Sequence, residues 1–261
     1  MISSASNPHV RHLRSLRDLP RERRSERSVF LEGVRLVSDA LASGAQPRLA
    51  LYAPEQLRAT PAGAALLAQL ASRPGCYEAT PAAVAAAADT QHPQGVVAAF
   101  PWPELAPRPG LRLVLDALQD PGNVGTLLRS AEAAGVGLVL CARGTADIYG
   151  PKVLRAAMGA HFSLPVQADL DWDAIAAELS ACPVIYAAEA AASMPYYAAD
   201  WKQPAGLIIG AEARGVSEAG LALATHRIAI PMVGRSESLN AGVAGSVILF
   251  EALRQRTRGR T

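Results

Sequence analysis

Short apolar runs alternate with helical patterns along most of the chain. Near the start, Val10, Leu13 and Leu16 recur at helical spacing after Asn7-Pro8, a typical helix start. Apolar runs predict strands at residues 29–31, 49–52, 95–100, 111–115, 137–141, 184–187, 207–209 and 227–230. Helices are predicted at residues 34–41, 61–71, 81–88, 123–134, 151–158, 171–179, 217–224 and 238–254. This alternation indicates an α/β fold with a mainly parallel sheet that is covered on both faces.

A proline-rich stretch divides the pattern into two parts. Four prolines lie between Pro101 and Pro109, where neither a helix nor an interior strand can continue. We therefore expect a linker, with a smaller α/β/α domain at residues 1–103 and a larger domain at residues 104–261. Ligands of parallel sheets bind beyond the carboxyl ends of the strands, so polar residues at those ends are the first candidates for a site.

Charge changes this picture only when it is read locally. The chain has 261 residues, of which 50% are hydrophobic, and its net charge is +2, which on average argues against a strongly electrostatic nucleic-acid binder. However, seven arginines lie between Arg11 and Arg27, within a basic arm at residues 1–28. A solvated helix face and a phosphate-contacting arm both explain them. The C-terminal tail adds Arg254, Arg256, Arg258 and Arg260.

The sequence argues against several classes of protein. No apolar stretch approaches the roughly 18 to 20 residues that span a bilayer, and the arginine-rich start does not resemble a secretory signal. The three cysteines, Cys76, Cys141 and Cys182, are far apart and fit neither a disulfide framework nor a zinc site. The histidines have no spaced partners. We expect no metal, no membrane association and a cytoplasmic location.

The first cluster of candidate site residues follows the predicted strand at 111–115. Gly122 and Gly125 allow close approach of another backbone, Asn123 is placed to cap the next helix, and Arg129 lies six residues further on. The glycine spacing is not that of a dinucleotide-binding turn, and no Walker loop is present. A capped turn with a surface arginine is the structural alternative.

Two further clusters follow later strands. Glu212 lies between Gly210 and Gly215 after the strand at 207–209, where a carboxylate without a partner costs stability. Ser238 and Asn240 lie in a polar loop before the last predicted helix, and either residue could simply cap that helix.

Together the three clusters resemble the motifs of the SpoU/TrmH family of RNA ribose 2′-O-methyltransferases, in the SPOUT class. The matching segments, in the family's order, are Asn123-Val-Gly125 with Arg129, Gly210-Ala-Glu212-Ala-Arg-Gly215, Ile230-Pro-Met232 and Ser238-Leu-Asn240. Phe30-Leu-Glu-Gly33 and Gln91-His-Pro-Gln-Gly95 resemble the family's N-terminal substrate-binding domain, which has a ribosomal-protein-like fold. The chain departs from the family at Ala241-Gly242, where Val-Ser is common, and at Arg235 and Glu237.

The resemblance implies a reaction, a cofactor and a set of roles. Such enzymes bind S-adenosylmethionine in a deep C-terminal trefoil knot and usually pair as homodimers. The implied cofactor-binding residues are Gly210, Ile230 and Leu239, and the implied catalytic residues are Arg129, Asn123, Glu212, Ser238 and Asn240. Arg129 would clamp the ribose-phosphate, Asn123 would orient the ribose or Arg129, and Glu212 would position the arginine or its loop.

The implied substrate is structured RNA, and the N-terminal domain favours 23S ribosomal RNA over tRNA. No DNA partner is expected. A tRNA 2′-O-methyltransferase and a non-catalytic RNA-binding or ribosome-assembly factor are the alternatives within this resemblance. A nicotinamide-dependent enzyme fits the alternation of strands and helices but lacks the glycine fingerprint.

Overall fold

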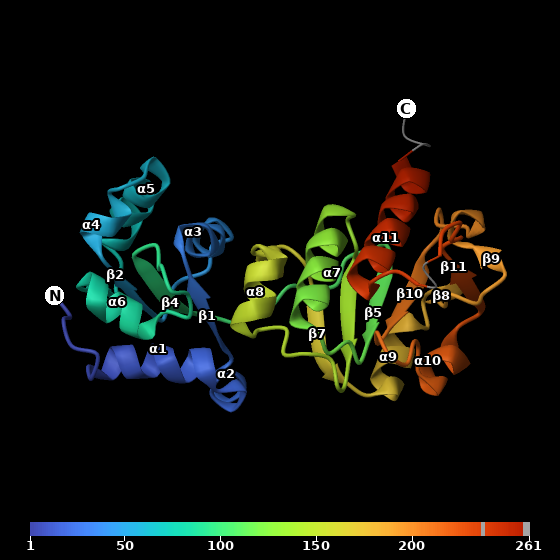
Figure 1. Ribbon diagram of the computed structural model, residues 1–261, viewed down its shortest axis with the longest axis horizontal. Coiled ribbons are helices and arrows are strands. Elements are labelled where there is room, and N and C mark those ends of the chain that lie inside the picture. Colours follow the sequence, from blue (N-terminus) through green and yellow to red (C-terminus); the bar gives the residue numbers. More distant parts are fainter. Residues whose placement is uncertain (236–237, 258–261) are drawn as a thin grey trace. The chain divides into compact units, whose positions relative to one another are not determined.

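The structure is a computed structural model that describes residues 1–235 and 238–257 (Figure 1). Glu237 and the tail arginines Arg258 and Arg260 lie outside the described residues. The chain forms two compact units. The N-terminal unit contains Met1–Pro103 and Tyr149–Arg155, and the C-terminal unit contains the rest of the described chain.

The N-terminal unit is built on a four-stranded sheet in the order β1-β4-β2-β3. Its strands are β1 (Ser28–Glu32), β2 (Leu49–Tyr52), β3 (Cys76–Glu78) and β4 (Val96–Pro101). Its helices are α1 (Pro8–Asp18), α2 (Pro20–Glu26), α3 (Val34–Ala42), α4 (Pro54–Leu57), α5 (Pro61–Leu70) and α6 (Pro81–Ala87). Helices α1 and α6 cover one face of the sheet, and α3 and α5 cover the other (Figure 1). The predicted α/β/α layering is therefore confirmed.

Helix α1 shows why the arginine-rich segment folds. The Asn7 side chain accepts a hydrogen bond from the His9 backbone N–H at 2.9 Å, and Pro8 occupies the first turn. Val10, Leu13 and Leu16 are fully buried in the core on the α1 and α6 side of the sheet. Residues 1–28 are thus part of the packed unit rather than an extended arm.

The C-terminal unit contains a seven-stranded sheet in which every neighbouring pair of strands is parallel, in the order β7-β6-β5-β10-β8-β11-β9. The strands are β5 (Arg112–Asp116), β6 (Leu138–Ala142), β7 (Val166–Leu170), β8 (Val184–Ala188), β9 (Met194–Pro195), β10 (Ala205–Gly210) and β11 (His226–Ala229). Its helices are α7 (Pro121–Ala133), α9 (Trp172–Leu179), α10 (Glu218–Leu223), α11 (Ala241–Thr257) and the 3₁₀ turns η1 (Ala160–Phe162) and η2 (Tyr196–Ala198), while most residues of α8 (Pro151–Ala157) belong to the N-terminal unit. The predicted parallel α/β sheet is confirmed.

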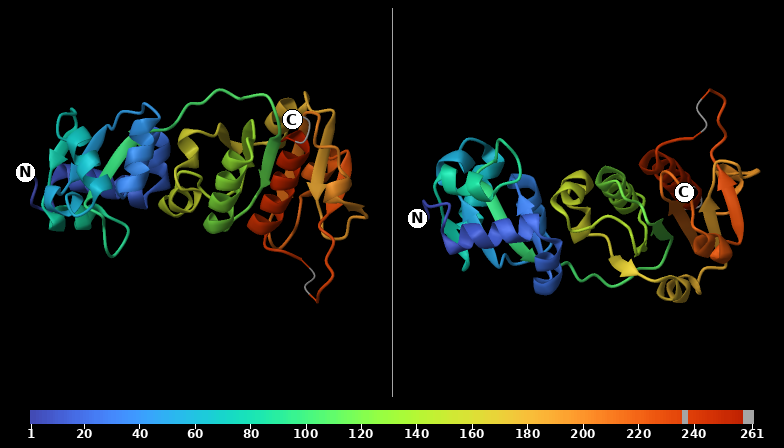
Figure 2. Two further views of the ribbon diagram at one scale, coloured as in Figure 1. Left: turned by 90° about the horizontal axis from the view of Figure 1, so that it is seen from above. Right: turned by 60° about the horizontal axis from the view of Figure 1, so that its bottom comes forward.

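Helices cover both faces of this sheet. Ile175 and Leu179 of α9 pack with Val114 and Ile208 of the central strands in one core cluster. Helices α7 and α11 lie side by side on the other face (Figure 2). Their approach is close, because a Cβ at Gly245 would lie 2.4 Å from a methyl carbon of Leu127.

Two predicted helix starts are wrong. Helix α7 begins at Pro121, and its N-cap is Asp120, whose carboxylate accepts from the Asn123 backbone N–H at 2.8 Å. Asn123 therefore lies inside the first turn and does not cap the helix. Helix α11 begins at Ala241 rather than at residue 238, because Asn240 is the capping residue and accepts from the Val243 N–H at 3.2 Å.

Candidate active site

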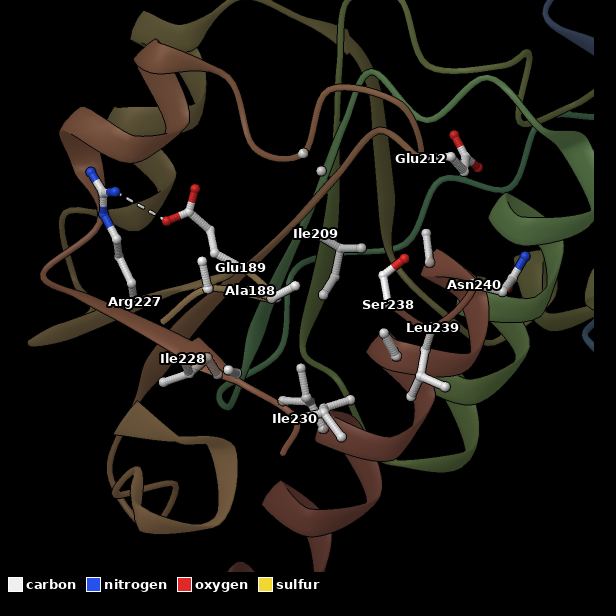
Figure 3. A pocket seen from close by; sticks show the side chains of 18 of the residues that line it. Ala188, Glu189, Ile209, Glu212, Arg227, Ile228, Ile230, Ser238, Leu239 and Asn240 are labelled. Carbon is white, nitrogen blue, oxygen red and sulfur yellow. Dashed lines mark ion pairs between the residues drawn. The ribbon is translucent and has the colours of Figure 1, made fainter. Parts of the chain in front are cut away.

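A cavity of about 730 Å³ opens at the carboxyl ends of three central strands of the C-terminal unit (Figure 3). It is lined by residues that follow β8, β10 and β11 and by the first turns of α11. Its walls are mostly apolar, formed by Ile209, Ile228, Ile230, Ile248 and several alanines. This volume and lining are typical of sites that bind a small organic molecule.

The loop after β10 folds directly over the end of its own strand. The Gly215 N–H donates to the Ala211 carbonyl at 2.8 Å, which closes a tight turn around Glu212. A Cβ at Gly210 would lie 2.1 Å from the carbonyl carbon of Gly215, so only glycine fits beneath this turn. Further along, the buried Asp116 accepts from the Ser217 N–H at 2.6 Å and holds the other end of the loop.

This loop brings the first two sequence clusters together. The Asn123 side-chain amide donates to Glu212 Oε1 at 2.6 Å, although the two residues are 89 positions apart in the sequence. Asn123 is buried, with 8% of its surface exposed. The amide is free to make this bond because Asp120, and not Asn123, caps α7. An orienting hydrogen bond of this kind fixes both side chains at one end of the cavity.

The third cluster adjoins the same end of the cavity. Ser238, Leu239 and Asn240 line the cavity with Glu212. A Cβ at Gly242 would lie 3.2 Å from the side-chain oxygens of both Asn123 and Asn240. Gly242, which the sequence marked only as a departure from the family pattern, therefore leaves room for two asparagine side chains over the first turn of α11. We call Glu212, Ser238 and Asn240, with Asn123 behind them, the polar end of the cavity.

Arg129 differs from the other candidates. It is exposed on α7, and it forms no hydrogen bond or ion pair with any residue that the structure describes. It is also not among the residues that line the cavity. Six of the eight candidates line the cavity directly: Gly210, Glu212, Ile230, Ser238, Leu239 and Asn240.

The sequence interpretation missed one charged pair in the cavity wall. Arg227 Nη1 lies 3.1 Å from Glu189 Oε2, and both residues line the cavity (Figure 3). Glu189 follows β8 immediately, so the rule that selected Glu212 at a strand end also selects Glu189 once β8 is placed. In a run of alanines, however, a single glutamate carries no pattern that points to a site.

His161 is a polar residue that lies outside the cavity lining. His161 is buried and shares a 2.7 Å hydrogen bond between its Nε2 and the Ile148 carbonyl, and burial lowers the pKa of its ring to about 4. No three His, Cys, Asp or Glu side chains gather into a group that could hold a metal among the described residues. None of the helices that the structure describes is long and apolar enough to cross a membrane.

Comparison with known proteins agrees with the resemblance found in the motifs. The profile of the SpoU rRNA Methylase family matches residues 110–250, and that of the MRM3-like substrate binding domain matches residues 7–98. The chain belongs to the SpoU rRNA methylase family. The family membership predicted from the three clusters is thereby confirmed, whereas the knotted path of the chain stays a prediction.

Relatives match both units of the chain. The 23S rRNA (guanosine(2553)-2′-O)-methyltransferase RlmP of Bacillus subtilis is 32% identical, with 95% of this chain and 97% of that protein covered. The mitochondrial rRNA methyltransferase 3A of Danio rerio is 34% identical, and the match covers 89% of this chain and 65% of that longer protein. The crystal structure of the SpoU methyltransferase AviRb from Streptomyces viridochromogenes, in complex with AdoMet, is similar with a TM-score of 0.84 and 28% identity, covering 96% of this chain and 98% of that one.

Proposed function

We propose that this protein is an S-adenosylmethionine-dependent RNA ribose 2′-O-methyltransferase and that its substrate is 23S ribosomal RNA. The observation that carries the proposal is the bond between Asn123 and Glu212, which joins two family motifs at the polar end of a cofactor-sized cavity. The names of the relatives, which include 23S rRNA 2′-O-methyltransferases, support the reaction and the class of substrate.

The residues of the cavity fit an adenosyl cofactor. Gly210, Ile230 and Leu239 line it from three segments of the chain, and Gly210 adds no side chain to its wall. These three residues would hold the adenosyl group between apolar walls. When bound, S-adenosylmethionine supplies an electrophilic methyl group on its sulfonium, so the protein's task is to align the acceptor hydroxyl. The AdoMet complex of AviRb supports this assignment.

The polar end orients the acceptor, and Arg129 receives the RNA. Arginine keeps its charge in proteins and presents a planar set of donors that suits phosphate. An exposed guanidinium without an internal partner is therefore available to clamp the phosphate beside the target ribose. Asn123 and Glu212, fixed by their mutual hydrogen bond, orient the ribose or Arg129, and Ser238 and Asn240 complete this end of the site.

The N-terminal domain, residues 1–103, provides a second RNA surface in this proposal, while residues 104–261 carry the reaction. Arg11, Arg14 and Arg24 are exposed on α1 and α2 and form no ion pair with the described residues. Exposed arginines on neighbouring helical turns suit the regularly spaced phosphates of RNA. The match of residues 7–98 to a substrate-binding domain supports this role. The proposal places the protein in the cytoplasm with the ribosome, a point that cell fractionation tests.

The proposed assembly is a homodimer. Val243, Val247 and Phe250 share one face of α11 at spacings of four and three residues, and 48%, 36% and 48% of their surfaces are exposed. An apolar stripe of this kind is typical of an interface. In sedimentation velocity, we expect a dimer for the natural chain and a monomer for Phe250→Glu. A natural chain that sediments as a monomer contradicts this part of the proposal.

The central test is methyl transfer from a labelled donor into ribosomal RNA. We expect Arg129→Ala to lower the rate by about a hundred-fold or more, with donor affinity unchanged, because the lost contact acts on the RNA and its transition state. Arg143→Ala is a matched control, since Arg143 is an exposed arginine of the same unit whose ion-pair partner is Asp171. Equal rates for Arg129→Ala and the natural chain contradict the role of Arg129. Mapping 2′-O-methyl positions in ribosomal RNA from a deletion strain identifies the nucleotide.

A further inference from the structure

Glu189 stands between two strand ends that are assigned to the cofactor. In the β8–β10 pair, Ala187 lies opposite Ile208, so two residues further on Glu189 is level with Gly210. In the β8–β11 pair, Ala188 lies opposite Ile228, so Glu189 is level with Ala229, the residue before Ile230. Neighbouring strands are about 4.8 Å apart. Glu189 therefore emerges between Gly210 and Ile230.

The Glu189 carboxylate has a spare acceptor. Its Oε2 is paired with Arg227 at 3.1 Å, whereas its Oε1 receives no hydrogen bond from the residues that the structure describes. The Glu189 side chain is 24% exposed and lines the cavity, so this oxygen is available to a molecule inside it. Arg227 orients the carboxylate and compensates its charge.

The charged pair is separated from the polar end of the cavity. In Figure 3, Glu189 and Arg227 lie on one side of the cavity, Glu212 and Asn240 lie on the other, and Ile209 lies between them. The reacting methyl group must face the polar end, where Asn123 and Glu212 are fixed. Glu189 therefore meets a part of the cofactor that does not react.

The chemistry of the cofactor indicates that the part that Glu189 contacts is the ribose. An ionised carboxylate only accepts hydrogen bonds, and the two adjacent hydroxyls of a ribose supply two donors within its reach. An acidic side chain at the carboxyl end of a parallel strand is also a common partner of ribose hydroxyls in sheets that bind adenine nucleotides. If the adenine is held at Gly210 and Ile230, the ribose, which is bonded to the adenine, lies beside Glu189. The amino-acid part of the cofactor is one further group away, beyond the sulfonium.

We propose that Glu189, oriented by Arg227, binds the ribose hydroxyls of the adenosyl cofactor and makes the cavity selective for adenosyl ligands that carry both hydroxyls. This inference rests on the proposed function, because it takes S-adenosylmethionine as the occupant of the cavity. It adds to that function a residue for cofactor recognition that none of the three sequence clusters contains.

Calorimetric titration with ligands that cannot react tests the inference without measuring activity. The ligands are S-adenosylhomocysteine, its 2′,3′-dideoxy analogue, and 5′-methylthioadenosine, which lacks the amino-acid part. The proteins are the natural chain, Glu189→Gln, and Glu178→Gln as a matched control. Glu178 is a half-buried glutamate of α9 that accepts from Gln167 Nε2 at 3.1 Å and lies outside the cavity lining.

We expect Glu189→Gln to bind S-adenosylhomocysteine and 5′-methylthioadenosine more weakly than the natural chain does, by about ten-fold or more for both ligands. Each ligand loses hydrogen bonds to a charged acceptor. The dideoxy analogue should bind the natural chain and Glu189→Gln within two-fold of each other, since it offers no hydroxyls to lose. Glu178→Gln should bind all three ligands as the natural chain does. Unchanged thermal unfolding of Glu189→Gln shows that the loss is local.

Three results overturn the inference while the proposed function stands: unchanged affinity of Glu189→Gln for S-adenosylhomocysteine, an equal loss for the dideoxy analogue, or a loss for S-adenosylhomocysteine that 5′-methylthioadenosine does not share. The last result assigns Glu189 to the α-ammonium group of the amino-acid part instead. A natural chain that does not bind S-adenosylhomocysteine overturns the proposed function, and the inference falls with it.

Discussion

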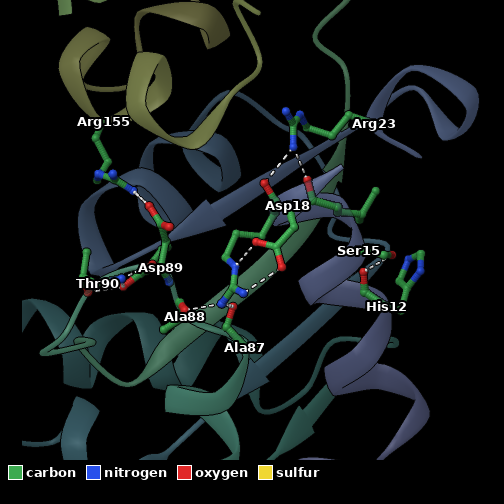
Figure 4. A network of polar contacts seen from close by, with 12 residues as sticks. His12, Ser15, Asp18, Arg23, Ala87, Ala88, Asp89, Thr90 and Arg155 are labelled. Carbon is green, nitrogen blue, oxygen red and sulfur yellow. Dashed lines mark hydrogen bonds and ion pairs between the residues drawn. The ribbon is translucent and has the colours of Figure 1, made fainter. Parts of the chain in front are cut away.

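The helix pair α1–α2 and the α7 end of the cavity both concentrate polar side chains, but they use them differently. In the helix pair, Arg23 donates to the Leu16 and Arg17 carbonyls at 2.5 and 2.8 Å, at the end of α1 (Figure 4). Arg17 in turn donates to the carbonyls of Ala87 and Ala88, where α6 ends. Helix ends leave carbonyls without internal partners, and these two arginines satisfy them.

At the cavity, the corresponding bond joins two side chains. Asn123 lies in the first turn of α7 and Glu212 in the loop after β10, and neither side chain satisfies a helix end. Arg129 lies six residues, about one and two-thirds turns, further along the same helix and has no described partner. The number of arginines in a region therefore does not locate the function. Arginines bonded to nearby carbonyls hold the fold, whereas Arg129, an exposed arginine without a described partner on the helix that carries Asn123, is available to a ligand.

The variants that remove the Asn123–Glu212 hydrogen bond should lower the rate of methyl transfer most. We expect Asn123→Ala and Glu212→Ala each to slow single-turnover methyl transfer by about a hundred-fold, because either change removes the hydrogen bond that holds the polar end of the cavity in place. The double variant should be no slower than the slower single variant, since both remove one unit. Thermal unfolding should shift little.

Ser130→Ala is the control for that cycle. Ser130 lies on the same helix, and its hydroxyl contacts that of Ser246 on α11 at 2.7 Å, away from the cavity lining. The Ser130→Ala variant should transfer methyl groups at the same rate as the natural chain. Rate losses that multiply in the double variant show that Asn123 and Glu212 act independently and not as one unit.

The sequence predicts the central elements well and the edges poorly. The buried strands β5, β6, β8 and β10 are short apolar runs, and each was predicted within two residues of its observed bounds. Strand β3 was missed because its residues are largely exposed, and β7 and β9 lie at the two edges of their sheet without an apolar run. A strand at an edge is defined by its pairing with a neighbour, and its own side chains carry little of that information.

Site residues follow the same division. Glycines and a carboxylate at a strand end mark a tight turn, so Gly210 and Glu212 could be selected from their spacing. The bond to Asn123 could not be predicted, because it depends on where α7 begins. The signal for that start was present in Asp120-Pro121, since proline favours the first position of a helix and aspartate the position before it. The end of β8 alone points to Glu189, but its place between Gly210 and Ile230 required the register of β8 against its two neighbours.

His161 sharpens the comparison because it is a buried polar group of the C-terminal unit with a structural role. Its pKa is lowered to about 4 by burial, whereas the unfolded chain has the ordinary value near 6.5. As the pH falls from 6.5 to 4, His161 becomes protonated in the unfolded state but stays neutral in the folded state. Stability is therefore lost in this window, by about 3 kcal/mol, and the loss levels off below pH 4.

Chemical denaturation at a series of pH values measures this loss. We expect His161→Gln to be less stable at pH 7, to lose little further stability between pH 6.5 and 4, and to transfer methyl groups at an unchanged rate per folded molecule. A pH profile of the variant that parallels that of the natural chain assigns the acid sensitivity to other groups.

The smallest expected effects separate two adjacent arginines of α2. Arg23 is 3% exposed and bonded to two carbonyls, so Arg23→Ala should lower the free energy of unfolding by about 2 kcal/mol. Arg24 is exposed and carries no described ion pair, so Arg24→Glu should change stability by less than about 0.5 kcal/mol. Arg24→Glu should instead weaken RNA binding several-fold at low salt and leave donor binding unchanged, because a phosphate contact is lost to a like charge.

The pair is informative because the two side chains share one helical turn and differ only in what they face. Denaturant titration and RNA binding at two salt concentrations, made on both variants, distinguish the two roles. If Arg24→Glu binds RNA as tightly as the natural chain at both salt concentrations, the exposed face of α2 is a solvated surface. The RNA contacts of the N-terminal domain must then be sought on another face, and the free arginine of α7 becomes the one whose function the structure indicates.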